Sequence, residues 1–69
     1  MSIFAQKVSK EALELARLCD ISNSQYDEAN ALKYANAAYQ ESGLETHKEV
    51  RDALGANVAY YVFEYGWGE

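Results

Sequence analysis

Proline is absent from the 69-residue chain, and only four glycines interrupt it. Gly43, Gly66 and Gly68 fall where a helical pattern ends, whereas Gly55 falls inside one. A sheet of short strands needs many turn-forming residues, so this scarcity disfavours a β protein. We therefore expect an all-α fold in a single domain, residues 1–69, because a chain of this length builds one small core.

The chain has one cysteine and one histidine, which limits the chemistry it can support. Cys19 has no partner for an internal disulfide, so a reducing cytoplasm is the expected setting. Cys19 and His47 are too few to form a zinc site, and Cys19 falls on an apolar helix face, where cysteines are usually inert. Phosphate-binding glycine loops and nucleophile elbows are also missing. We expect no metal, no other cofactor and no enzymatic activity.

Basic residues are outnumbered, with six Lys and Arg against eleven Asp and Glu, which gives a net charge of −5. Such a charge repels nucleic-acid phosphates and anionic lipids, so direct binding to nucleic acid or to a membrane is disfavoured. No apolar run approaches the roughly 20 residues that span a bilayer. The N-terminus also lacks the pattern of a secretory signal, so we expect a soluble cytoplasmic protein.

Two stretches in the first part of the chain carry apolar residues at helical spacing. The first predicts a helix over about 2–18. The second predicts a helix over about 22–42, because Ser22 and Gln25 match a capping box and Gly43 matches the residue that follows a helix. Ile21 and Tyr26 are placed as a hydrophobic staple at its start. Its apolar face is mostly alanine, which allows another helix to approach closely: Ala31, Leu32, Ala35, Ala38 and Tyr39.

The clearest periodicity predicts a third helix over about 46–65, beginning with a capping box of Thr46 and Glu49. Gly55 costs such a helix about 1 kcal/mol relative to alanine. The β-branched and aromatic residues of 57–65 leave a strand as the alternative there. Short loops make neighbouring helices antiparallel, so we predict a small antiparallel three-helix bundle. The apolar stripe of the third helix, with one polar member, is Val50, Ala53, Leu54, Asn57, Val58, Tyr61, Val62 and Tyr65.

The opposite side of this third helix supplies the clearest functional signal. It begins with carboxylates and continues with aromatic rings, a pattern that an ordinary solvated helix face also explains. Tyr and Trp are enriched among the residues that dominate protein interfaces, and carboxylates beside them steer a basic partner. The predicted partner-binding residues are Glu45, Glu49, Asp52, Tyr60, Phe63 and Trp67.

Two functions fit this pattern. The first is a small acidic protein-binding module that docks on a basic surface of another protein and blocks or modulates it. In size and charge the chain is similar in general character to the anti-restriction and anti-CRISPR inhibitors of phages and plasmids, which implies a nucleic-acid-binding or defence protein as the target. The second is a structural homodimer in which Tyr60, Phe63 and Trp67 pack across a two-fold axis.

Overall fold

The computed structural model describes residues 8–65, and every regular element among them is helical. The predicted all-α three-helix bundle is confirmed, and the alternative of a strand at 57–65 is wrong because residues 56–64 are helical. The elements are α2 (Lys10–Ser24), α3 (Glu28–Ser42), α4 (His47–Leu54), α5 (Ala56–Ala59) and the π-helix η1 (Tyr60–Glu64).

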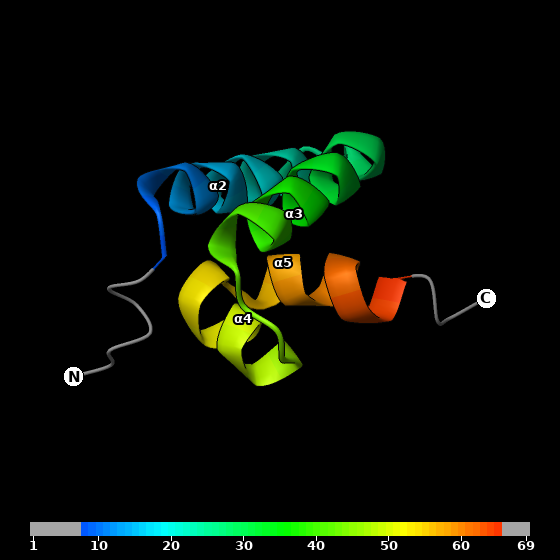
Figure 1. Ribbon diagram of the computed structural model, residues 1–69. Coiled ribbons are helices and arrows are strands. Elements are labelled where there is room, and N and C mark those ends of the chain that lie inside the picture. The colour runs from blue at the N-terminus through cyan, green and yellow to red at the C-terminus, as the bar shows by residue number, and fades with distance from the viewer. Residues whose placement is uncertain (1–7, 66–69) are drawn as a thin grey trace.

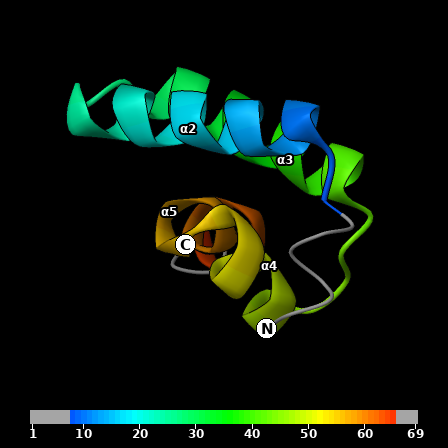
Figure 2. The same ribbon diagram turned by 90° about the vertical axis from the view of Figure 1, so that its left-hand side faces the viewer.

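The helices form two layers. α2 and α3 lie side by side and run in opposite directions, and α4 and α5 pass beneath them (Figure 1). Figure 2 views α5 nearly end-on while α2 and α3 extend across the picture. We call α4, α5 and η1 together the third limb of the bundle, and this limb crosses α2 and α3 obliquely. The core lies between this pair and the crossing limb.

Small side chains fill the seam between α2 and α3. All are 5% exposed or less, and none is larger than cysteine. Because they project so little from each backbone, the two helices pack closely over their length. The seam residues are Ala12, Ala16, Cys19, Ala31, Ala35 and Ala38.

Larger side chains from the third limb close the core from below. Val50 and Leu54 of α4, Val58 of α5 and Tyr61 of η1 are buried at the spacing that the sequence predicts. Partly buried Leu15 and other apolar residues pack around the core as a whole. The core is therefore built from small residues above and from branched and aromatic residues below.

The first predicted helix has different ends in the structure. It starts at Lys10, because Ser9 is its N-cap, with an extended backbone and a side chain that accepts a hydrogen bond from the Ala12 N–H at 3.1 Å. Residues 2–7 of the predicted helix lie outside the described part of the chain. The helix also continues past Leu18 to Ser24, because Cys19 and Ser22 extend its small buried face.

The predicted start of the second helix at Ser22 is therefore wrong. Ser22 lies inside α2, and α3 starts after Asp27, whose carboxylate accepts a hydrogen bond from the Asn30 N–H at 3.3 Å. The predicted staple does not form either, since Ile21 and Tyr26 are both exposed. The predicted end of this helix is confirmed, with Gly43 in the left-handed conformation at φ 72°.

The third predicted helix begins as expected and then breaks. The capping box of Thr46 and Glu49 is present, so this prediction is confirmed. The continuous helix predicted over 46–65 is wrong, because Gly55 has φ 109° and ψ 161° and separates α4 from α5. Only glycine adopts this backbone conformation readily. The break redirects the chain between Leu54 and Val58, both of which are buried.

We expect Gly55→Ala to lower the free energy of unfolding by about 1 to 3 kcal/mol, the cost of holding a residue with a Cβ in this conformation. Nothing lies within 4 Å of the added Cβ, so backbone strain alone sets the cost. Urea denaturation followed by far-ultraviolet circular dichroism measures it. In a continuous helix the same change would stabilise by about 1 kcal/mol, so a gain in stability would contradict the break.

Candidate interaction site

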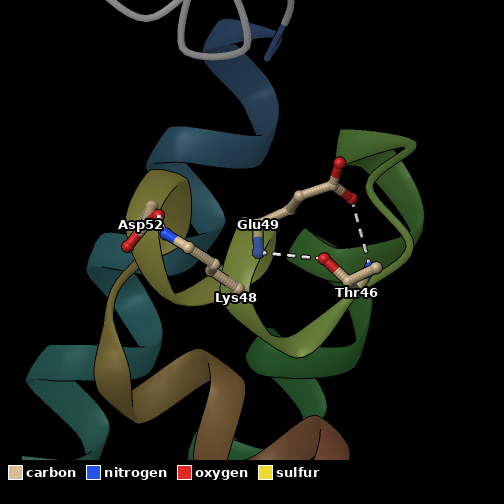
Figure 3. A network of polar contacts seen from close by, with 4 residues as sticks. All are labelled: Thr46, Lys48, Glu49 and Asp52. Carbon is tan, nitrogen blue, oxygen red and sulfur yellow. Dashed lines mark hydrogen bonds and ion pairs between the residues drawn. The ribbon is translucent and has the colours of Figure 1, made fainter.

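The acidic residues of the predicted surface lie on and just before α4, where two of them already have partners (Figure 3). One Glu49 carboxylate oxygen accepts hydrogen bonds from the backbone N–H groups of Glu45 and Thr46, both at 3.2 Å. These bonds lower the pKa of Glu49 below its ordinary value of 4.5, and the bond from the Thr46 N–H has the largest effect. Asp52 pairs with Lys48 at 3.0 Å. Glu49 therefore caps a helix, and Asp52 is paired with a cation of its own chain.

The aromatic residues of the predicted surface are divided between two environments. Phe63 is half-buried and packs against the rings of Tyr39 and His47, with centroid distances of 5.6 and 5.4 Å. The imidazole of His47 also lies 2.8 Å from the Glu64 carboxylate. Phe63 thus joins η1 to α3 and α4, because Gly55 and the wider turn of η1 rotate it away from the position that a continuous α-helix predicts. Tyr60 is 45% exposed, and Trp67 lies outside the described residues.

Tyr60 belongs instead to a cluster of tyrosines on η1 and just after it. Its ring centroid lies 5.1 Å from that of Tyr61 and 6.1 Å from that of Tyr65, in edge-to-face geometry. The ring centroids of Tyr61 and Tyr65 are 5.2 Å apart. We call Tyr60, Tyr61 and Tyr65 the tyrosine cluster. The helical spacing predicted that Tyr61 and Tyr65 belong to the apolar stripe and that Tyr60 lies on the opposite side, so it did not predict contacts between them.

A chain of polar side chains attaches this cluster to the end of α2. The Tyr61 hydroxyl donates to Asn23 Oδ1 at 2.7 Å, and Asn23 Nδ2 donates to Asn57 Oδ1 at 3.4 Å. Asn57 Nδ2 then donates to Asp20 Oδ1 at 3.1 Å. Asn57 interrupts the apolar stripe because its side-chain amide links the third limb to α2.

Within residues 8–65, the carboxylate beside the tyrosine cluster and the one at the end of the polar chain have no cation beside them. Asp20 accepts the hydrogen bond from Asn57, and Glu28 lies 3.5 Å from the Tyr65 hydroxyl. Within residues 8–65, neither forms an ion pair with a basic side chain. These two acids, which the sequence analysis did not select, therefore present negative charge that the described chain does not neutralise.

Two buried groups, Cys19 and the Tyr61 hydroxyl of the cluster, favour their neutral forms. Burial, and after it the charge of Asp20, raises the pKa of the Cys19 thiol to about 11. Burial, and after it the charge of Glu28, raises the pKa of Tyr61 above its ordinary value of 10.0. Because folding raises both pKa values, these groups stabilise the fold fully below about pH 9 and lose that contribution as the pH rises further. At neutral pH the Cys19 thiol is thus protonated and buried.

No protein-family model matches the chain, and neither a curated protein nor a solved structure resembles it significantly. Within residues 8–65, no three His, Cys, Asp or Glu side chains are grouped so as to hold a metal ion. No helix in that range is both long and apolar enough to cross a membrane.

We expect Tyr61→Phe to lower the free energy of unfolding by about 1 to 2 kcal/mol, because Asn23 loses the hydroxyl that it accepts from. The matched control is Tyr60→Phe, whose hydroxyl has no hydrogen bond within residues 8–65 and whose loss should change stability by less than about 0.5 kcal/mol. Urea denaturation of both variants checks the difference. Equal effects would show that the hydrogen bond from Tyr61 to Asn23 contributes nothing to stability.

Proposed function

We propose that this chain is a small acidic helical module that docks on a basic surface of another protein and blocks or modulates it. The net charge of −5 supports this role, because it speeds encounter with basic surfaces and repels acidic ones. A partner whose basic surface normally holds nucleic acid fits the same chemistry, and occupying that surface would inhibit it.

The observation that carries the proposal is the exposed ring of Tyr60 within the tyrosine cluster, close to the carboxylate of Glu28, which forms no ion pair within residues 8–65. Tyrosine contributes a large and rigid contact area, and it is among the residues that dominate binding energy. The rings of Tyr61 and Tyr65 pack against the ring of Tyr60, so the Tyr60 ring is held in place before a partner binds. The contact surface is therefore centred on η1 and the start of α3, rather than on the acids of α4.

A structural homodimer through Tyr60 is the second candidate. The exposed ring suits it equally well, but a second copy would bring together carboxylates that form no ion pair within residues 8–65. Like charges placed across an interface oppose association, so the basic partner is favoured.

Affinity capture with matched variants tests the proposal. We expect immobilised wild-type chain to retain basic proteins at low salt and release them as salt rises, because screening weakens the attraction. Tyr60→Ser and Glu28→Gln should lose this retention, whereas Asp52→Asn should keep it because Asp52 pairs with Lys48. Equal retention by wild type and Tyr60→Ser, with both folded by circular dichroism, would overturn the proposal.

A further inference from the structure

Tyr26 combines two properties that fold stability does not explain. It is the one non-glycine residue within residues 8–65 that has a positive φ, at 61°. Its side chain is also 93% exposed, and none of its side-chain atoms makes a hydrogen bond or ring contact there. A bulky residue in this conformation costs about 1 to 2 kcal/mol, and here no packing offsets the cost.

The turn after α2 imposes the conformation. The Asp27 N–H donates to the Ser22 carbonyl at 2.9 Å, and the Tyr26 N–H donates to the Asn23 carbonyl at 3.1 Å. This pair of bonds is the Schellman motif, which requires a left-handed residue at the position of Tyr26 and usually has glycine there. Asn23 also bonds to Tyr61, so the register of the turn is fixed by the core. Glycine would therefore satisfy the backbone better than tyrosine does.

The sequence around Tyr26 is acidic. From residue 18 to residue 32 the sequence has no Lys, Arg or His, and its charged members are Asp20, Asp27 and Glu28. Glu28 and Asn23 also contact the tyrosine cluster, so this turn adjoins the proposed contact surface. An exposed ring beside carboxylates matches an arginine, whose guanidinium stacks on aromatic faces and pairs with carboxylates.

We propose that Tyr26 is a recognition residue that receives an arginine side chain of the basic partner, with the exposed Glu28 as the neighbouring carboxylate. Asp27 adds negative charge while both of its carboxylate oxygens accept hydrogen bonds from Asn30 at the start of α3. This inference rests on the proposed function and extends it by naming a contact residue and the side chain that it binds. A second copy of the chain fits less well, because residues 18–32 would then face an equally acidic surface.

The test uses a short oligoarginine peptide, with an oligolysine peptide of equal length for comparison. At low salt we expect wild-type chain to bind oligoarginine more tightly than oligolysine, with shifts of the Tyr26 ring resonances in nuclear magnetic resonance spectra. Tyr26→Gly should weaken oligoarginine binding by about fivefold or more while its melting temperature stays equal or rises. Tyr26→Phe keeps the ring and should keep most of the affinity.

Each other outcome overturns a specific statement. If wild type and Tyr26→Gly bind oligoarginine equally, the inference fails and the proposed function stands. If wild type binds neither peptide at low salt, the basic partner is contradicted as well. A lower melting temperature for Tyr26→Gly would assign Tyr26 a structural role. Tyr26 shifts that depend on chain concentration without peptide would indicate self-association instead.

Discussion

Leu54→Ala should lower the free energy of unfolding by about 2 to 5 kcal/mol, the usual cost of removing a leucine from a packed core. Leu54 is only 4% exposed and lies at the end of α4, where the break at Gly55 turns the chain toward α5. A domain of this size has about 3 to 10 kcal/mol of stability in total, so the variant should lose a substantial part of its stability.

The matched control is Leu13→Ala, because Leu13 is 45% exposed on α2. The same chemical change there should alter stability by no more than about 0.5 kcal/mol. Urea denaturation of both variants gives the comparison. Similar losses from the two leucines would contradict the placement of the core between the α2–α3 pair and the third limb.

Ala35→Leu should be damaging for the opposite reason. Ala35 is fully buried in the seam of small residues between α2 and α3, and a larger side chain must push the helices apart. Overpacking a well-packed core costs about 1 to 3 kcal/mol, and here the whole seam must separate. We expect a loss of about 3 kcal/mol, the upper end of that range.

Ala29→Leu supplies the control for this second prediction. Ala29 lies on the exposed side of α3, and leucine is nearly as good a helix former as alanine, so helix propensity cancels in the comparison. Thermal unfolding should show little change for Ala29→Leu and a clear loss for Ala35→Leu. If both variants are as stable as wild type, the two helices are not closely packed along this seam.

Much of the fold follows from local sequence signals. Scarce glycine, absent proline and helical spacing predict the all-α bundle, and the capping box at Thr46 predicts the start of α4. Both features depend on residues within one or two turns of each other. The same holds for Gly43, which ends α3 because it adopts the left-handed conformation that other residues avoid.

The remaining errors arise where distant contacts outweigh a local signal. Ser22 and Gln25 match a capping box, but burial of Ser22 and the bond between Asn23 and Tyr61 extend α2 past it. No local pattern indicates that Tyr26 takes the position where glycine is usual.

The predicted contact surface shows the same limitation. The prediction assumed one continuous α-helix with the same rotation at every residue. The break at Gly55 and the π-helix η1 both alter that rotation, so the residues face other directions. Tyr60 is exposed as the prediction requires, whereas Phe63 packs between α3 and α4. Glu28 beside the tyrosine cluster comes from α3, and Asp20 at the end of the polar chain comes from α2, so no pattern within the third helix identifies them.

The most direct test of the proposed module is the molar mass of the purified chain in solution, measured by light scattering at low and at high salt. We predict a monomer of 7.7 kDa at both salt concentrations, which leaves Tyr60 and the neighbouring carboxylates free for a basic partner. A dimer that persists or tightens at high salt would contradict this, because screening of like charges would then favour self-association through the exposed rings.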